Sequence, residues 1–200
     1  MQLLETIRYS NGTLENLRYH NERLNRSRKA LWQQTDRVDL EELILMPEYP
    51  AQEGQVFRCR VLFSETGMDL VEFIPYNRKV IRSLQVVRTG DLDYAHKYAD
   101  RSALQEKMTG ITADEVLFVR EGLLTDTSYT NVAVSDGSEW YTPHQPLLAG
   151  THRARLLAEG RIIPERLAID DLRYFREIRL LNAMMTWEES PTLPVSAIQL

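Results

Sequence analysis

The chain begins with two runs of alternating apolar and polar residues, in "LLETIRYSNGTLENLRY" at 3–19. Asn11-Gly12 separates the two runs, and this pair favours the tight two-residue turn of a β-hairpin. The next stretch, 20–34, places Leu24 and Leu31 on one apolar stripe at helical spacing, with arginines around it. This pattern predicts a hairpin followed by an amphipathic helix.

The rest of the first half reads mainly as strands. In "QVFRCRVLFS" at 55–64, strand periodicity predicts that alternate side chains point to opposite faces. One predicted face holds Val56, Arg58 and Arg60, and the other holds Phe57, Cys59 and Val61. Further strands are predicted at 68–76 and 81–89, and a short helix at 39–45 that ends near Pro47. The first half therefore predicts a sheet of about five strands with one or two helices.

The second half mixes helices with hairpins. Helices are predicted at 100–110 and 151–160, hairpins at 114–126 and 131–143, and an apolar strand at 177–185. A boundary between the two halves is expected near 88–96. Lys97 would then lie where two subdomains meet, which is a common location for a ligand cleft.

Composition narrows the class of protein. The chain has 200 residues, 43% of them hydrophobic and 26% charged, which is ordinary for a soluble globular protein. A net charge of −5 argues against a nucleic-acid surface, which needs a concentrated basic patch. Cys59 is the single cysteine, so no intrachain disulfide can form. No leader or bilayer-spanning apolar run is evident, so we expect a cytoplasmic protein without membrane association.

Lys97 lies in an unusual setting, in "LDYAHKYADRSAL" at 92–104. Of the 24 basic residues only Lys29, Lys79, Lys97 and Lys107 are lysines. An amine, unlike a guanidinium, can lose its proton and attack a carbonyl. The alternative interpretation is a surface lysine whose stem covers the neighbouring tyrosine rings.

Three other stretches each have a structural and a functional interpretation. "TDTSYTN" at 125–131 is either a polar loop or a carboxylate, Asp126, at a rigid strand end. "LLAGTHRARLL" at 147–157 is either a capped helix or an anion site at a helix start. "LLNAMM" at 180–185 is either a buried strand end or part of a site. His20 and Arg23, one helical turn apart, are typical of a solvated helix face.

The order of these motifs is more informative than any one of them. The chain has a hairpin, then "H-x-x-R-L", a lysine after the boundary, "D-x-S-x-x-N", "L-x-G-T-x-R" and last "E-x-x-x-x-N-A". From Glu5 to about Val195 this run resembles the class IV aminotransferases, which are fold-type IV pyridoxal-phosphate enzymes. That family includes branched-chain and D-amino acid aminotransferases and aminodeoxychorismate lyases.

The resemblance implies an architecture. It is the α+β, two-subdomain fold of the D-amino acid aminotransferase type. An N-terminal α/β subdomain is expected at 1–90 and a β-rich subdomain at 95–200, with pyridoxal 5′-phosphate between them. A homodimer is expected, because the family builds its pocket partly from a neighbouring subunit, and no metal site is expected.

The resemblance also implies roles for individual residues. Lys97 matches the lysine that bonds to the cofactor aldehyde, and Asp126 stands where the family usually has the glutamate that pairs with the pyridine nitrogen. Leu148 matches an apolar residue that packs on the ring. Arg23, Thr151, His152, Asn182 and Ala183 match positions that hold the phosphate. Arg8, in the first strand, is a candidate to bind a substrate carboxylate.

The implied activity is that of a 4-amino-4-deoxychorismate lyase, which gives p-aminobenzoate and pyruvate and serves folate biosynthesis. "LLNAMM" is similar to the "N-A-L-M" ending of such lyases rather than to the "G-T" or "T-S" endings common in transaminases. The alternative is a transaminase acting on branched-chain or D-amino acids. A second alternative is a protein that binds the cofactor or a partner without turnover.

Overall fold

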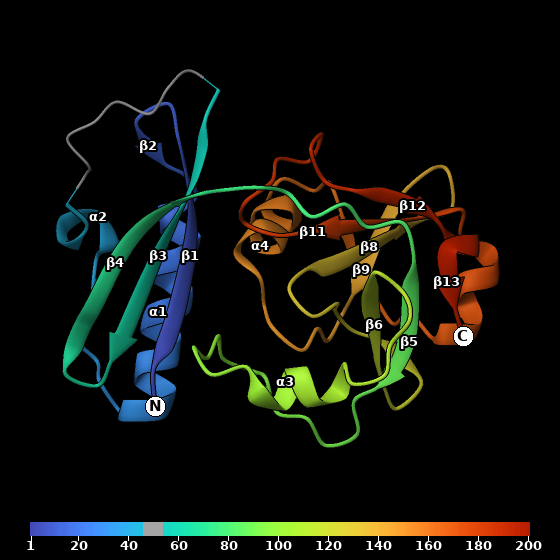
Figure 1. Ribbon diagram of the computed structural model, residues 1–200, viewed down its shortest axis with the longest axis horizontal. Helices are drawn as coiled ribbons and strands as arrows, with labels where there is room; N and C mark the ends of the chain where they lie inside the picture. The colour runs from blue at the N-terminus through green and yellow to red at the C-terminus, as the bar shows by residue number, and fades with distance from the viewer. Residues whose placement is uncertain (46–53) are drawn as a thin grey trace. The chain divides into compact units, whose positions relative to one another are not determined.

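The computed structural model describes residues 1–45 and 54–200, and these form two compact units. The first unit comprises Met1–Arg78 together with His96–Asp100. The second comprises Lys79–Ala95 and Arg101–Leu200 (Figure 1). The subdomain limits 1–90 and 95–200 stay a prediction about independent domains, which contacts within one structure do not test.

The first unit is an antiparallel sheet covered by helices. Strand β1 (Leu3–Ser10) is central, flanked by β2 (Thr13–Leu14) and by β3 (Val56–Ser64), and β3 pairs in turn with β4 (Gly67–Pro75). Asn11 and Gly12 both have positive φ, 49° and 76°, as the predicted two-residue turn requires. The hairpin is therefore confirmed, but its second strand is shorter than predicted. Helix α1 (Leu17–Trp32) begins within the stretch that was expected to be strand.

The two faces of this sheet differ in chemistry. Leu3, Ile7, Tyr9, Cys59, Val61 and Phe63 share a buried core with Leu24 of α1 and Leu40 of α2 (Leu40–Leu43). The opposite face carries Arg8 directly across from Arg58 and Thr6 across from Arg60. The alternation predicted for 55–64 is thus confirmed. Part of the predicted helix at 39–45 is present as α2, while Pro47 lies outside the described residues.

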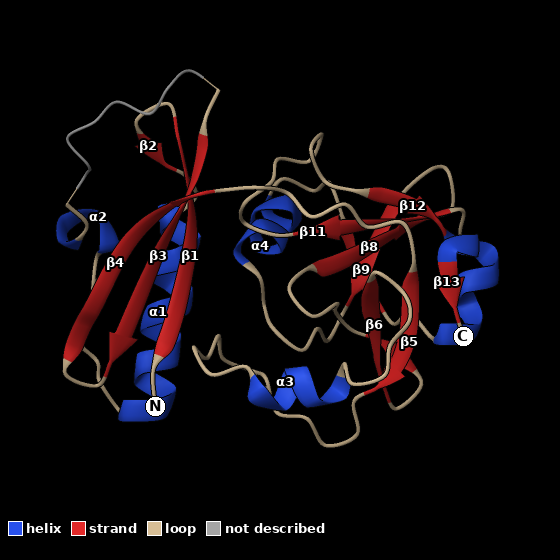
Figure 2. Ribbon diagram, in the orientation of Figure 1, coloured by secondary structure: helices blue, strands red, loops and turns tan. Residues whose placement is uncertain are grey.

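The second unit contains two sheets, shown in red in Figure 2. One has the order β13-β5-β6-β7 and the other β10-β9-β8-β11-β12. The strands of the first are β5 (Leu84–Arg88), β6 (Glu115–Arg120), β7 (Leu123–Leu124) and β13 (Ile198–Gln199). Those of the second are β8 (Asn131–Ser135), β9 (Trp140–Pro143), β10 (Ile163–Glu165), β11 (Glu177–Leu181) and β12 (Thr192–Pro194). The helices are α3 (Ser102–Lys107), α4 (Thr151–Ala158) and the 3-10 turns η1 (Ile169–Tyr174) and η2 (Val195–Ala197).

The assignment of 81–89 to the first sheet was wrong. Strand β5 pairs in parallel with β6, and its Leu84 is fully buried in the core of the second unit with Leu117 and Val119. Among the described residues the first sheet therefore has four strands. The predicted hairpin at 114–126 is confirmed, since Glu121 and Gly122 have φ of 53° and 78° between β6 and β7. The predicted strand 177–185 ends at Leu181 and continues as a turn.

The segment His96–Asp100 is attached to the first unit on two sides. The N–H of Leu4 donates to the carbonyl of Lys97 (2.8 Å), and the N–H of Ala99 donates to the carbonyl of Gln2 (2.9 Å). On the other side, His96 Nδ1 lies 2.9 Å from Ser27 Oγ of α1. Strand β1 and helix α1 thus fix the backbone around Lys97. No helix within 1–45 or 54–200 has the length and apolarity needed to cross a membrane.

Candidate active site

A buried ion cluster lies between β1 and α1 in the first unit. Glu5 accepts hydrogen bonds from Arg23 Nε (2.9 Å), from Arg23 Nη2 and from His20 Nδ1 (2.6 Å). The three side chains come from the inner face of β1 and from successive turns of α1. His20 and Arg23 are buried, so the expectation of a solvated helix face was wrong.

The charges within this cluster nearly cancel. Burial opposes ionisation of Glu5, but Arg23 and His20 outweigh it and lower the pKa of that carboxyl to about 2. Burial lowers the pKa of His20, against the pull of Glu5. The positive charges of Arg23 and Lys97 also act on His20, which places Lys97 in the same neighbourhood. At neutral pH the cluster therefore holds one carboxylate and one guanidinium around an uncharged imidazole.

Arg23 keeps donors available for an anion. Its Nε and Nη2 face Glu5, whereas Nη1 has no hydrogen-bond partner in the part of the chain that the structure describes. Since the guanidinium is planar and its fork is fixed by Glu5, the Nη1 edge is held in one direction. Arg8 stands apart from this cluster, on the opposite face of the sheet, where its Nε donates to Glu15 Oε1 (3.0 Å).

The second unit contains a buried carboxylate, Asp126, whose two oxygens both accept hydrogen bonds. Asn131 Nδ2 donates to Asp126 Oδ1 (2.7 Å), and the N–H of Leu148 donates to Asp126 Oδ2 (2.8 Å). Asn131 Nδ2 also donates to the carbonyl of Leu148 (2.8 Å), which closes a triangle of three residues. Asp126 is thus held in one orientation at the end of β7, and Leu148 is fixed beside it.

Burial makes the carboxyl of Asp126 a much weaker acid than an exposed aspartate. It raises the pKa of this carboxyl to about 7, although the hydrogen bonds from Leu148 and Asn131 and the charge of Arg153 act in the opposite direction. A carboxyl with a pKa near 7 can hold or release a proton under physiological conditions. A nearby cation, such as a protonated pyridine, would favour the ionised form.

Helix α4 begins next to this triangle. Gly150 is its N-cap, and a Cβ built at Gly150 would lie 2.0 Å from Asn131 Oδ1, so only glycine leaves room for that amide. Within the helix the N–H of Ala154 donates to the carbonyl of Gly150 (2.9 Å). The N–H groups of the first turn lie at the positive end of the helix dipole.

The predicted phosphate positions of the second unit lie at two adjoining backbone segments. Thr151 and His152 are buried at the start of α4, and Asn182 and Ala183 form the turn after β11. His152 Nδ1 lies 2.8 Å from the carbonyl oxygen of Asn182 and joins the two segments.

Sequence reasoning gave no role to Glu5 or Arg153. Glu5 had a detectable signal, since a carboxylate alternating with Leu3 and Ile7 falls on the inner face of the strand. Arg153 is buried, and its Nη2 donates to the carbonyl of Pro143 (2.7 Å), next to the loop that holds Leu148. Its contacts depend on chain segments remote in sequence, so no local pattern could show them.

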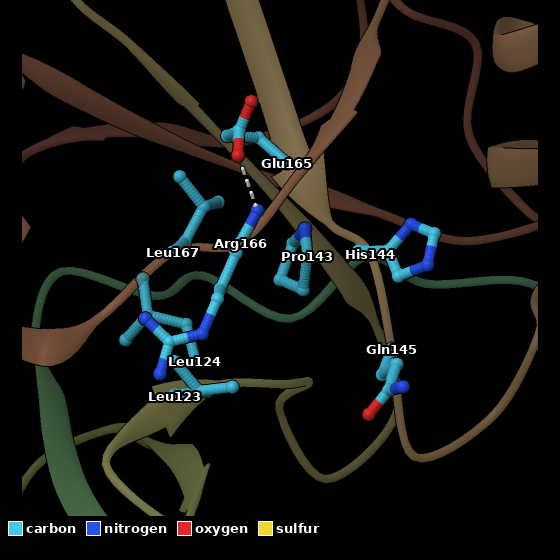
Figure 3. Close-up of a pocket in the computed structure, with 8 residues that line it drawn as sticks. All are labelled: Leu123, Leu124, Pro143, His144, Gln145, Glu165, Arg166 and Leu167. Atoms are coloured by element: carbon cyan, nitrogen blue, oxygen red, sulfur yellow. Dashed lines mark hydrogen bonds between the residues drawn. The ribbon is translucent and has the colours of Figure 1, made fainter.

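A pocket of about 150 Å³ elsewhere in the second unit includes none of the predicted residues (Figure 3). Its apolar side is formed by Leu123, Leu124, Leu167 and Pro143, and its polar side chains are those of His144, Gln145, Glu165 and Arg166. All four polar side chains are exposed. The pocket lacks the buried polar groups that fix the orientation of a specific ligand.

The donor set fits pyridoxal 5′-phosphate within each unit. The first unit offers an amine at Lys97 and, at Arg23, a guanidinium nitrogen that has no hydrogen-bond partner among residues 1–45 and 54–200. The second offers a buried carboxyl at Asp126, an apolar residue at Leu148 and the N–H groups of the first turn of α4. A phosphate dianion suits a helix N-terminus and an arginine, and a carboxylate suits a pyridinium.

Comparison with known proteins agrees with this chemistry. A family model described as amino-transferase class IV matches residues 2–196. An uncharacterized protein of Haemophilus influenzae (strain ATCC 51907 / DSM 11121 / KW20 / Rd) is 33% identical over 184 residues, covering 91% of this chain and 97% of that protein. A crystal structure of a candidate 4-amino-4-deoxychorismate lyase from Haemophilus somnus 129PT is 31% identical, with a TM-score of 0.81, and the match covers 92% of this chain and 96% of that one.

A third similarity concerns the fold. A hypothetical aminotransferase of Mycobacterium tuberculosis in its PLP-bound form is 18% identical, with a TM-score of 0.71, over 96% of this chain and 80% of that one. The α+β architecture expected from the sequence is confirmed by the mixed helices and sheets and by these neighbours. The chain belongs to the class IV aminotransferases and is a pyridoxal-phosphate-dependent enzyme.

Proposed function

We propose that the protein is a 4-amino-4-deoxychorismate lyase, which cleaves its substrate to p-aminobenzoate and pyruvate. The observation that carries this proposal is the turn Asn182–Met185 after β11, which presents Ala183, without a hydroxyl, beside the start of α4. The 31% identity to a candidate lyase from Haemophilus somnus over nearly the whole chain supports it.

Each proposed residue has a defined role. Lys97 would hold the cofactor through its amine and would move the α-proton of the substrate as a general base. Asp126 holds the proton at the pyridine nitrogen. The groups proposed to hold the phosphate are Arg23 Nη1 in the first unit and, in the second unit, the N–H groups of the first turn of α4 with Asn182 and Ala183. The bound cofactor supplies an electron-withdrawing ring that stabilises negative charge at the substrate carbon.

The face of the first sheet opposite α1 is proposed to meet a substrate carboxylate. Arg8 and Arg58 lie directly across from each other on β1 and β3, where two like charges disfavour the sheet unless an anion balances them. Glu15 neutralises part of this charge through Arg8. The substrate of the proposed lyase carries two carboxylates, and so does one substrate of many transaminases, so this face suits both activities.

The two activities differ in their demand for a second substrate. In the lyase reaction the bond from the ring to the enolpyruvyl oxygen breaks, and a ring proton is lost. The ring becomes aromatic, and the released enol takes a proton to become pyruvate. The atoms balance without water or another acceptor. A transaminase leaves its amino group on the cofactor and needs a keto acid to complete the cycle.

A single-substrate assay tests the proposal. Aminodeoxychorismate without any keto acid should give many turnovers per enzyme, with p-aminobenzoate and pyruvate in equal amounts. Turnover of a branched-chain or D-amino acid with 2-oxoglutarate or pyruvate, combined with a silent lyase assay, would establish the transaminase instead. A protein that turns yellow with the cofactor but is silent in both assays would be a binding protein.

A further inference from the structure

One hydrogen bond in the proposed phosphate cup connects two segments that are thirty positions apart. His152 Nδ1 lies 2.8 Å from the carbonyl oxygen of Asn182. A carbonyl oxygen only accepts hydrogen bonds, so Nδ1 must carry the hydrogen. In the uncharged ring, Nε2 is then a bare acceptor.

The surroundings of His152 favour this uncharged form. The residue is 1% exposed, and its Nε2 is buried without a hydrogen-bond partner in the described chain. Burial and the positive charges of Arg155 and Arg161 lower the pKa of the imidazole, while Glu188 and the bond to Asn182 act against this. The side chain of His152 is thus buried, and its Nδ1–H already donates to the carbonyl of Asn182.

The acceptor, the carbonyl oxygen of Asn182, belongs to the first residue of the turn after β11. The carbonyl of Asn182 also accepts the N–H of Met185 (3.3 Å), and Asn182 Oδ1 accepts the N–H of Met184 (2.9 Å). Asn182 therefore organises the turn with both its backbone and its side chain. A bond from α4 to this carbonyl fixes where the turn stands relative to the start of the helix.

We infer that His152 is a positioning residue that holds the Asn182–Met185 turn against the start of α4 through its Nδ1–H, so that the cup binds phosphate with backbone N–H groups and not with the imidazole. The inference rests on the proposed function for the identity of the anion. It adds a role for the side chain of this residue, since the imidazole stabilises the cup and does not touch the ligand.

The test compares two ligands that differ only in the phosphate. Apoprotein is titrated with pyridoxal 5′-phosphate and with pyridoxal. The dissociation constant of pyridoxal divided by that of pyridoxal 5′-phosphate reports the contribution of the cup. The side chain of asparagine places a donor where imidazole has Nδ1, whereas glutamine places it where imidazole has Nε2. His152→Asn should keep the ratio of the unmodified protein. His152→Ala and His152→Gln should each lower it about tenfold, as expected for losing one buried hydrogen bond.

A matched control is His144→Ala, because His144 is an exposed histidine of the same unit and should leave the ratio unchanged. A readout without cofactor follows hydrogen exchange of the amides at 182–186, which should be faster in His152→Ala and His152→Gln than in His152→Asn. Equal ratios and equal exchange in all three variants would overturn the inference.

Two further outcomes separate this inference from the proposed function. If the unmodified protein binds both ligands equally well, the phosphate cup itself is wrong. If the variants fail to fold, nitrogen chemical shifts of His152 in the unmodified apoprotein decide. An uncharged ring protonated at Nδ1 supports the inference, and a ring protonated at Nε2 overturns it.

Discussion

At the scale of single residues, the best-defined part of the site is the triangle of Asp126, Asn131 and Leu148. Its three hydrogen bonds have donor–acceptor distances between 2.7 and 2.8 Å. Asp126 is one methylene shorter than the glutamate usual in the family. The triangle fixes the carboxylate from two sides, so its direction is set without a ligand.

Replacing Asp126 by alanine should leave the cofactor bound and lower the catalytic rate by about two to four orders of magnitude. This is the usual scale for losing a charge that stabilises a transition state. The rate must be measured per molecule of bound cofactor, because Leu148 also loses an acceptor for its N–H. Full activity in the variant would show that another group serves the pyridine nitrogen.

Gly150→Ala should destabilise the protein by about 1–3 kcal/mol, the range for forcing an extra methyl group into a packed interior. The added Cβ would lie 2.0 Å from Asn131 Oδ1. A double-mutant cycle gives the control. In an Asn131→Ala background the same substitution should cost much less, and an equal cost in both backgrounds would contradict this explanation.

At the scale of elements, α1 is joined to β1 by charge as well as by apolar packing. Glu5 on the strand accepts three hydrogen bonds from the helix, and the same strand binds the backbone of Lys97 through Leu4. Strand β1 therefore orients a candidate phosphate ligand with a side chain and the candidate lysine with its main chain.

Glu5→Gln should lower the free energy of unfolding by about 3–5 kcal/mol at pH 7, because Arg23 is left as an uncompensated buried charge. The native pKa of Glu5, about 2, lies below its ordinary value of 4.5. Its contribution is therefore complete above pH 4.5 and is lost as the pH falls towards 2. Urea unfolding of both proteins should show the difference shrinking as the pH falls from 4.5 to about 2.

Asp36→Asn is the matched control for this experiment. Asp36 pairs with Arg28 of the same helix, but its side chain is 70% exposed. Exposed ion pairs contribute little, so this variant should stay within about 1 kcal/mol of the unmodified protein. A loss as large as that of Glu5→Gln would mean that burial is not the cause.

The sequence pattern predicted those elements that depend only on residues close together in the chain. The Asn11-Gly12 turn needs two residues tolerant of positive φ, and the period of two in β3 follows from one buried face. Strand β5 was assigned to the wrong sheet because its partner, β6, lies some thirty residues later, and pairing over that separation leaves no mark in the local sequence. His152 was predicted as a site residue, but the acceptor of its side chain lies beyond β11 and could not be predicted.

At the scale of the whole molecule, the two units contribute different chemistry. The first holds the amine and an arginine, and the second holds the carboxyl and the helix start. The proposed reaction needs all four groups. A homodimer remains our prediction for the assembly, and size-exclusion chromatography with light scattering should give twice the mass of the 23.3 kDa chain.

Borohydride reduction of the protein with bound cofactor, followed by peptide mapping, should locate the pyridoxyl group on Lys97. The backbone of Lys97 is held by β1, and its amine is close enough to act on His20. Lys79 and Lys107 are internal controls, since both belong to the second unit. A label on either of them would refute the assignment.

The course of the chain between the two units determines what happens when the protein is cut into two fragments. The backbone leaves the first unit after Arg78, returns for His96–Asp100 and leaves again at Arg101. A single cut between 79 and 95 therefore yields an N-terminal fragment without the candidate lysine and a C-terminal fragment in which the segment around Lys97 has lost its hydrogen bonds to Gln2 and Leu4. We therefore expect that neither fragment alone turns yellow with the cofactor and that the recombined fragments recover the colour.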